Sequence, residues 1–428
     1  MMAKRRKTNS LFVGINGQHV GVFERSGGTH AFTYSDEWLS SEIAHPISLS
    51  MPLTKNRHTG DLVRYYFDNL LPDDVEIRKL IVDRVGAYSI DTMDLLSEIG
   101  RDCVGSLSLT SEPVNGIDDL KFEAMDEGDI ATHLRNTAMR RTLGMDGDDV
   151  FRISIAGAQE KTALTLYEGN WYRPLGTTPT THIFKLPIND LENGLKLTNS
   201  VDNEWFCLRF MHHLGFDVAQ ADIRTFEDQK ALVVERFDRT WGEDGLLYRL
   251  TQEDMCQALG RAGQSKYEAN GGPGAKEISG LLRFSSQSAR DMYQFFLAQY
   301  AFWLLMGIDG HAKNFSVYLD HTGHWLTPLY DVISAHPFKA QFRRNQLKMA
   351  MKVLSKNSHY IWTDIHMRHW RNHATKTFLI EDVAMGYIAE LNRNVENALD
   401  EAFSDAGKDF DQNTGNIIAE SIMEKINR

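Results

Sequence analysis

The feature that most constrains the fold is a long apolar segment that ends in a polar, glycine-containing loop. Residues 291–306 carry apolar and aromatic side chains on nearly every side of a helical projection, which predicts a helix buried in the core of a domain. Gly307 and Gly310 interrupt this helix and place Asp309 between them. A carboxylate on a rigid, buried base is well positioned for catalysis.

The loop leads into a predicted β-hairpin whose second strand ends at Asp331. If Asp320 faces His324 across the turn, Asn314 lies opposite the residue before Asp331. Facing residues on neighbouring strands are about 5 Å apart, so we expect the side chains of Asn314 and Asp331 to converge on one cation. A small set of oxygen ligands suits Mg²⁺, whose shell is then completed by water and phosphate.

Asp309 lies five residues before Asn314. This is the separation in the catalytic loop of protein kinases, where the Asp accepts the proton of the substrate hydroxyl. Lys313 lies between the two and is placed to neutralise charge on a γ-phosphoryl group. An Asp-Gly pair by itself is more typical of a turn, so the kinase interpretation requires a nucleotide site elsewhere in the chain.

A loop of small residues between two strand-like segments is a candidate phosphate-binding loop. It lies between residues 151–155 and 162–167, and small side chains let backbone N–H groups approach phosphate oxygens. A Walker A loop does not fit, since Glu160 stands where the second glycine belongs and a strand follows instead of a helix. An ordinary β-turn remains the alternative for this loop alone. The candidate nucleotide-binding residues here are Ala156, Gly157, Ala158, Gln159, Glu160 and Lys161.

A lysine inside an apolar strand supplies the next candidate. Lys185 lies in the strand-like segment 182–187, and it either reaches the α- and β-phosphates of a nucleotide or points into water from an edge strand. The helix predicted at 201–214 has Glu204 near its start. Glu204 is the candidate ion-pair partner of Lys185, and Asp202 is close enough to be the alternative.

The strand predicted at 230–239 turns polar at Glu235, as expected where a kinase chain crosses between its lobes and its backbone pairs with adenine. The chain thus presents a glycine loop, a strand lysine, a helix glutamate, an Asp-x4-Asn motif and a strand-end Asp in kinase order. This order favours a kinase over a set of unrelated turns.

The strand and helix patterns predict an α+β protein with several parts. Residues 1–110 form an N-terminal α+β module and 111–149 a connector. Residues 150–245 form a strand-rich lobe that holds the nucleotide site, and 246–428 a mostly helical lobe that holds the catalytic loop and the metal-binding Asp.

Composition excludes several other classes of protein. The length of 428 residues suggests two or three domains, and the net charge of -12 argues against broad nucleic-acid binding by this chain alone. The three cysteines show no paired spacing, so neither a disulfide framework nor a zinc site is indicated. No apolar run reaches the roughly 18 residues of a membrane span, and no apolar signal segment follows the basic N-terminus. We expect a cytoplasmic protein with no membrane partner.

Several segments closely resemble the HipA serine/threonine kinase toxins, from about residue 11 to 355. Two of these segments, 67–72 and 95–102, lie in the first module. The others are Ser154-Ile155-Ala156-Gly157-Ala158-Gln159-Glu160-Lys161-Thr162-Ala163-Leu164, the stretches 180–187 and 234–239, and Asp309-Gly310-His311-Ala312-Lys313-Asn314.

The resemblance implies a two-lobed protein-kinase-like fold with an additional N-terminal subdomain, and use of ATP and Mg²⁺. It implies that Glu235 and Phe237 offer backbone groups to adenine and that His311 and Lys313 assist the phosphates. It also implies autophosphorylation at Ser154, which would expel the phosphate loop and inactivate the kinase. Against standard kinases, Asp331-Val332-Ile333 replaces Asp-Phe-Gly and no His-Arg-Asp motif is present.

The same resemblance implies the toxin of a type II toxin–antitoxin pair, bound to the DNA-binding antitoxin HipB and, mainly through HipB, to operator DNA. Its implied substrate is a translation component, glutamyl-tRNA synthetase above all, with growth arrest and antibiotic tolerance as the result. Two alternatives stay open: a catalytically idle co-repressor that only binds HipB, and a small-molecule phosphotransferase with the same core.

A histidine-rich helix near residue 370 carries two weaker signals. Its three histidines lack cysteines and have one acidic neighbour, so we favour a solvated face over a metal site. Its basic patch is better explained as solvated charge than as a DNA contact. The histidines are His366, His369 and His373, and the patch is Arg368, Trp370, Arg371 and Lys376.

Overall fold

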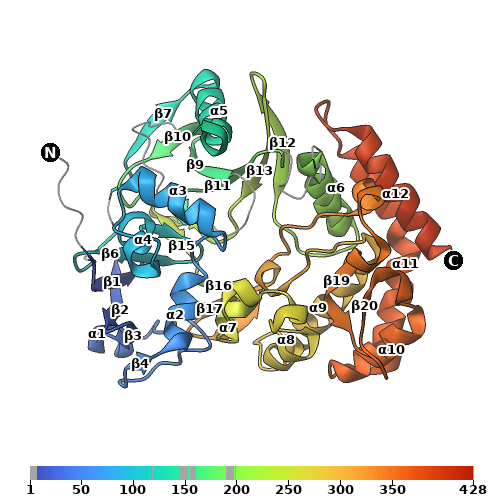
Figure 1. The fold of residues 1–428 in the computed structure, drawn as a ribbon, viewed down its shortest axis with the longest axis horizontal. Helices are drawn as coiled ribbons and strands as arrows, with labels where there is room; N and C mark the ends of the chain where they lie inside the picture. The colour runs from blue at the N-terminus through green and yellow to red at the C-terminus, as the bar shows by residue number, and fades with distance from the viewer. Residues whose placement is uncertain are drawn as a thin grey trace.

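The computed structural model describes residues 7–427 except 115, 118, 144–152, 155–160, 189–196 and 198. Figure 1 shows a small sheet with its helices at the lower left, a larger sheet across the top and a group of helices at the lower right. The mixture of helices and sheets confirms the predicted α+β class.

The first module folds around an antiparallel sheet with the strand order β4-β3-β2-β1-β6. Its first hairpin turns at Asn16 and Gly17, with φ of 46° and 79°, as a two-residue hairpin turn requires because both of its positions need left-handed backbone. Side chains of the sheet and of α2 to α4 share one buried cluster. The elements are β1 Ser10–Ile15, β2 Gln18–Ser26, β3 Thr29–Tyr34, α1 Asp36–Leu39, β4 His58–Thr59, α2 Asp61–Asp68, α3 Val75–Val85, α4 Thr92–Ile99, β5 Asp102–Cys103 and β6 Leu107–Thr110.

The larger sheet has the strand order β12-β13-β11-β9-β10-β7. Its edge strand β7 and the helix α5, which packs on its face, both come from the segment 111–149 that we expected to be a connector. That segment therefore contributes to the lobe. The elements are β7 Phe122–Met125, α5 Glu127–Leu143, β8 Ile153–Ser154, β9 Lys161–Tyr167, β10 Asn170–Pro174, β11 His182–Lys185, α6 Ser200–His213, β12 Ala221–Phe226 and β13 Gln229–Glu235.

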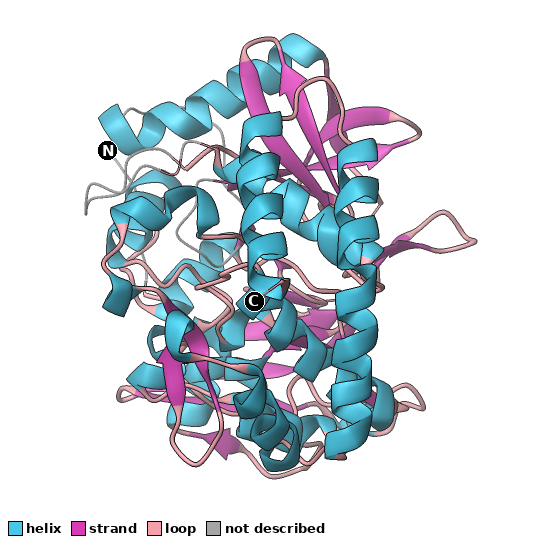
Figure 2. Cartoon of the chain, turned by 90° about the vertical axis from the view of Figure 1, so that its right-hand side faces the viewer, coloured by secondary structure: helices cyan, strands magenta, loops and turns pink. Residues whose placement is uncertain are grey.

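The predicted buried helix is α9, whose Phe295 and Phe296 are inaccessible to solvent. The same core cluster includes Phe206 and Phe210 of α6, so the two lobes share packing around the catalytic loop. Figure 2 shows helices covering this side of the molecule. The elements are β14 Arg239–Trp241, β15 Leu247–Arg249, β16 Gln252–Asp254, α7 Met255–Ala258, α8 Ala275–Leu282, α9 Ser288–Leu304, β17 Ser316–Asp320, β18 Gly323–Leu326, β19 Lys348–Val353, β20 His359–Ile361, α10 Met367–Lys376, α11 Glu381–Ser404 and α12 Gln412–Ile426.

The hairpin after the catalytic loop differs from its predicted register by one residue. Asp320 pairs with Gly323, and Leu319 with His324, because the chain reverses in a two-residue turn. The second strand, β18, ends at Leu326, so the pairing does not extend to Asn314 and that prediction was wrong.

The chain reaches Asp331 by another route. Leu329 forms a parallel bridge with Val218, in which its N–H donates to the carbonyl of Asp217 and its carbonyl accepts from the N–H of Ala219, each at 2.8 Å. This bridge, rather than the hairpin, positions the end of the segment beside the larger sheet. Among the described residues, no helix is both long and apolar enough to cross a membrane.

Candidate active site

A buried lysine with two carboxylates forms the centre of the candidate site. Lys185 ends β11, an inner strand of the larger sheet, and its Nζ lies 2.6 Å from Glu204 Oε1 on α6 and 2.6 Å from Asp331 Oδ1. Asp202 instead pairs with Lys230 at 2.6 Å. The partner of the strand lysine is therefore Glu204, and an edge-strand lysine pointing into water is excluded.

The charges of this group stabilise one another. Burial alone would lower the pKa of Lys185, but the carboxylates of Asp331 and Glu204 raise it. Burial would likewise raise the pKa of Asp331, but the two ammonium groups of Lys185 and Lys161 hold it well below its usual range. The side chain of Asp331 is thus a carboxylate anion. Its backbone φ of 60° lies in the left-handed region, which a residue with a side chain rarely adopts outside constrained, often functional, positions.

A second lysine lies next to the first. Lys161 at the start of β9 is the register partner of Lys185, so the two side chains leave the same face of the sheet. Burial lowers the pKa of Lys161 to about 8, with Lys185 acting in the same direction and Asp331 against it.

The remaining candidates of the phosphate loop, residues 156–160, lie outside the described residues. Ser154 belongs to β8, which pairs in parallel with β5 of the first module, Ser154 opposite Cys103. The segment ahead of the phosphate loop is thus joined to the N-terminal module by strand pairing.

Asp309 lies at the surface of the catalytic loop, and its backbone is held by a hydrogen bond within that loop. The Asp309 side chain is 49% exposed, so a substrate hydroxyl can reach it. Asn314, at the end of a short 3-10 turn, donates from Nδ2 to the backbone carbonyl of Asp309 at 2.8 Å. The amide oxygen, on the other side of the same group, is then the Asn314 atom available to a cation.

His311 lies near both carboxylates of the site. Its Nε2 is 3.6 Å from Asp309 Oδ1, and the carboxylate of Asp331 is close enough to act on the pKa of the ring. Burial lowers the pKa of His311 itself, which favours the neutral ring. Its Nδ1 is buried without a hydrogen-bond partner among the described residues, as expected of a group whose ligand is a phosphate oxygen or water.

Lys313 faces away from this centre. Its Nζ lies 2.7 Å from Asn69 Oδ1 and 3.1 Å from Asp254 Oδ2, with Asp73 Oδ1 at 3.9 Å. Two of these partners, Asn69 and Asp73, belong to the loop after α2 in the first module. These contacts brace the catalytic loop against that module and do not match the expected role at a γ-phosphoryl group.

The strand β13 leads into the expected crossing between lobes. The N–H of Glu235 donates to the carbonyl of Gln220 at 2.8 Å, and the carbonyl of Phe237 accepts from Tyr318 Oη at 2.8 Å. The backbone is therefore held on both sides of Arg236.

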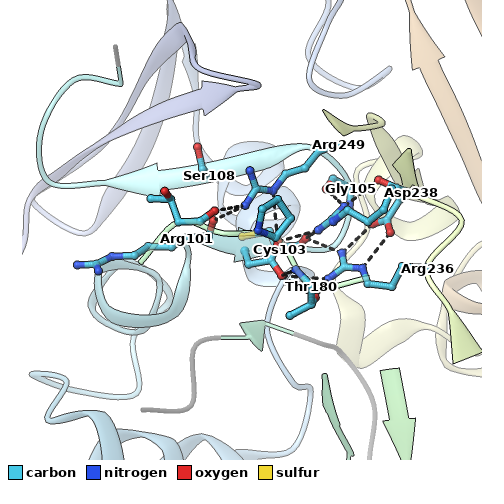
Figure 3. A network of polar contacts seen from close by, with 12 residues as sticks. Arg101, Cys103, Gly105, Ser108, Thr180, Arg236, Asp238 and Arg249 are labelled. Atoms are coloured by element: carbon cyan, nitrogen blue, oxygen red, sulfur yellow. Dashed lines mark hydrogen bonds and ion pairs between the residues drawn. The ribbon is translucent and has the colours of Figure 1, made fainter. Parts of the chain in front are cut away.

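A buried cluster of charges anchors this crossing to the first module (Figure 3). Asp102 of β5 lies 2.8 Å from Arg239, 3.2 Å from Arg249 and 3.3 Å from Arg236, and Asp238 lies 2.8 Å from Arg236. Burial would raise the pKa of Asp102, but the three guanidinium groups hold it well below its usual range.

Sequence reasoning missed this cluster. The run Arg236-Phe237-Asp238-Arg239 directly after an apolar strand is a visible signal, since charged residues that are buried need partners. Its partner Asp102 is 134 positions away from Arg236, however, and nothing local identifies it.

The histidine-rich helix is α10, and the prediction of a solvated face was wrong for most of it. His369, Trp370 and His373 are buried, and His373 lies with Nε2 3.0 Å from Gln299 Oε1 and accepts at Nδ1 from the N–H of Leu354. Among the described residues, no group of three or more His, Cys, Asp or Glu side chains is arranged to hold a metal ion. With Trp370 in the core, the expected basic patch reduces to the exposed Arg368, Arg371 and Lys376.

The oxygen atoms at the site fit a hard divalent cation. Asp331 would supply an ionised carboxylate and Asn314 an amide oxygen, and further positions would remain for phosphate and water, as Mg²⁺ prefers. The buried, partnerless Nδ1 of His311 nearby is consistent with a site that receives an anionic ligand together with the cation.

Comparison with known proteins relates most of the chain to one family. A family model described as the HipA-like C-terminal domain matches residues 153–401, and one described as the HipA N-terminal domain matches residues 11–110. The chain is 34% identical over 352 residues to the protein Y4mE of Sinorhizobium fredii, with 80% of each chain covered.

The chain is also 31% identical over 369 residues to the serine/threonine-protein kinase toxin HipA of Shewanella oneidensis, covering 81% of this chain and 79% of that one. Its fold is similar to that of a chain in the solved complex of HipA, HipB and operator DNA from Shewanella oneidensis. The TM-score is 0.82 at 22% identity, with 97% and 96% of the two chains covered. The kinase-like α+β fold is thereby confirmed.

Proposed function

Because this chain belongs to the HipA family, we propose that it is an ATP- and Mg²⁺-dependent serine/threonine protein kinase and the toxin of a type II toxin–antitoxin system. The observation that supports this most directly is the ion-paired group in which Lys185 Nζ lies 2.6 Å from both Glu204 and Asp331. A strand lysine that pairs with a helix glutamate and with the carboxylate after the catalytic loop is the arrangement that protein kinases use to bind nucleotide phosphates.

Adenine binds at the crossing between the lobes. The N–H of Glu235 and the carbonyl of Phe237 already have protein partners. The groups that contact the adenine edge are accordingly the carbonyl of Glu235 and the N–H of Phe237. The Asp102 cluster keeps this segment fixed while nucleotide enters, which limits the ordering cost of binding.

The phosphates lie over the lysines and the loop. Lys185 and Lys161 contact phosphate oxygens, and the neutral ring of His311 supplies a further donor. The candidate role of residues 156–160, from their sequence, is to add backbone amides. Asn314 Oδ1 and Asp331 would hold a magnesium ion, which would neutralise phosphate charge. Lys185 then exchanges its contact with Asp331 for a phosphate oxygen and retains Glu204.

Asp309 accepts the proton of a serine or threonine hydroxyl. The hydroxyl oxygen forms a bond to the γ-phosphorus as the bond from that phosphorus to the bridging β-oxygen breaks, and ADP leaves with the bonding electrons. His311 Nε2 lies 3.6 Å from Asp309 Oδ1. Because the ring is neutral, it does not form an ion pair with the Asp309 carboxylate, which stays free to accept the proton.

Autophosphorylation at Ser154 would switch this kinase off. A phosphoserine dianion two residues before Ala156 competes for the backbone amides that otherwise bind ATP. The strand pairing of β8 with β5 is the feature of the described structure that such a charge would disturb.

The proposed partners are supported by the family and by the relative that was solved with HipB and operator DNA. The chain binds the antitoxin HipB, and reaches operator DNA mainly through it for autoregulation. Its substrate is a component of translation, with glutamyl-tRNA synthetase the first to test. Phosphorylation of that enzyme would arrest growth and give antibiotic tolerance.

Intact-mass spectrometry after incubation with ATP and Mg²⁺ tests the kinase. The wild type should gain one phosphate at Ser154 or transfer it to glutamyl-tRNA synthetase, and Asp309→Asn should not. If the wild type labels neither itself nor any protein, the kinase proposal is wrong.

Two results would favour the alternatives. Growth unaffected by overexpression without antitoxin, together with operator repression that still needs this chain, supports an idle co-repressor. Phosphate that appears on a metabolite instead of a protein supports a small-molecule phosphotransferase.

A further inference from the structure

The neighbouring residues of the catalytic loop do not fix the orientation of the Asp309 carboxylate. Asn314 donates to the Asp309 backbone and not to its carboxylate. Lys313 contacts Asn69 and Asp254 instead, and His311 Nε2 is beyond hydrogen-bond distance at 3.6 Å. A carboxylate that is half-exposed and must point one oxygen at a substrate needs a donor that fixes the other.

The hydroxyl of Tyr267 provides that donor, since it hydrogen-bonds to Asp309 Oδ1. We propose that Tyr267 is a positioning residue for phosphoryl transfer, which fixes Oδ1 so that the second carboxylate oxygen faces the acceptor hydroxyl. This inference rests on the proposed role of Asp309 as the proton acceptor.

The ring of Tyr267 is itself held in place. It packs edge-on against His311 with ring centroids 4.9 Å apart and an interplanar angle of 89°. Its backbone carbonyl accepts from the N–H groups of Asn270 and Gly272 at 2.9 and 3.1 Å. A Cβ on Gly272 would lie 1.9 Å from the carbonyl oxygen of Ser265, so this tight loop requires glycine there.

The neighbours of Tyr267 brace the same loop from three directions. The carbonyl of Lys266 accepts from the N–H of Ala312 in the catalytic loop at 3.2 Å, and its Nζ lies 3.2 Å from Asp73 of the first module. Glu268 pairs with Lys352 of β19 at 3.0 Å. Tyr267 is therefore supported well enough to control the orientation of a side chain.

The test compares Tyr267→Phe with the wild type, using the full chain with ATP and Mg²⁺ and following phosphate incorporation by intact mass. Removal of the hydroxyl should lower the rate at saturating ATP on the order of tenfold, the usual effect of losing a hydrogen bond to a charged group. The ATP concentration for half-maximal rate should stay within about twofold, because the hydroxyl does not touch ATP. Tyr293→Phe removes a hydroxyl from a ring pair with Tyr387 on the same lobe and should change neither value.

An unchanged or increased rate in Tyr267→Phe would overturn the inference. An increased rate would mean that the hydroxyl of Tyr267 blocks the Asp309 carboxylate. An equal rise in the half-saturating ATP concentration would overturn it too, by assigning Tyr267 to nucleotide binding. A wild type without activity would instead overturn the proposed kinase function.

A double-mutant cycle keeps the test informative even if Tyr267→Phe is less stable. Unfolding in urea of Tyr267→Phe, Asp309→Asn and the double variant should show clear non-additivity, since the two side chains interact directly. Additive changes would show that the contact is absent in solution and would overturn the inference.

Discussion

The ammonium of Lys313 lies 2.7 Å from the amide oxygen of Asn69, a residue 244 positions earlier in the chain. Asn69 in turn donates from Nδ2 to the carbonyl of Arg261 at 2.9 Å. The first module is thereby part of the support of the catalytic loop.

Lys313→Met should destabilise the protein by about 3 kcal/mol, because the partly buried Asp254 loses its cation and Asn69 Oδ1 loses its donor. Urea unfolding followed by tryptophan fluorescence measures the change, as a lower midpoint. Lys276→Met, at an exposed position of α8, is the matched control and should leave the midpoint unchanged. Equal midpoints for both variants would contradict the bracing role.

Lys185→Met should lower the rate of phosphoryl transfer on the order of 100-fold, since a charge-assisted contact to the phosphates is lost. The measurement is single-turnover phosphate transfer from labelled ATP. Lys230→Met, which breaks an ion pair of the same 2.6 Å length with Asp202, serves as the control in the same sheet. Similar losses in both variants would mean that the effect of Lys185 is on folding.

Glu253 should make stability depend on pH. Its carboxylate is buried against Ser48 and Leu49 of the first module, and burial raises its pKa from 4.5 to about 8. Between these values the folded protein binds a proton that the unfolded chain has released, so stability should fall as pH rises through this window.

The glutamine in Glu253→Gln cannot ionise, so the stability of this variant should fall less as pH rises. The urea midpoints of wild type and variant, compared at pH 5 and at pH 8, measure the difference. Parallel losses in wild type and variant would assign the pH dependence to another group.

Asp102→Asn should destabilise the protein by about 3 kcal/mol, because three buried guanidinium groups lose their shared anion. It should also weaken ATP binding by shifting the segment from Glu235 to Phe237. Calorimetric melting and nucleotide titration measure the two effects, with Asp400→Asn on the exposed face of α11 as control. If the variant is destabilised but binds ATP normally, the Asp102 cluster does not position the nucleotide site.

The order of motifs along the chain predicted the α+β class and the pairing of Lys185 with Glu204. Such motifs are local, and their spacing follows from strand and helix geometry. The register between Asp320 and His324 could not be predicted reliably, because a two-residue and a three-residue turn differ by one position and the sequence admits both.

Contacts between distant segments were beyond sequence reasoning. Neither Tyr267 nor Asn69 has a local pattern that connects it to the catalytic loop, since a single side chain on an irregular segment carries no periodicity. The burial of His373 was missed for a similar reason: its partner Gln299 lies on another helix, and a histidine-rich helix face is ordinarily solvated.

The attachment of Lys313 to Asn69 has a consequence for how the molecule comes apart. A chain shortened to residues 111–428 would lose the partner of its catalytic loop and, with Asp102, the anion that three arginines share. The remaining residues therefore need the first module to keep the catalytic loop in place. Native-state hydrogen exchange should show it opening together with the segment around Asp309 as one cooperative unit.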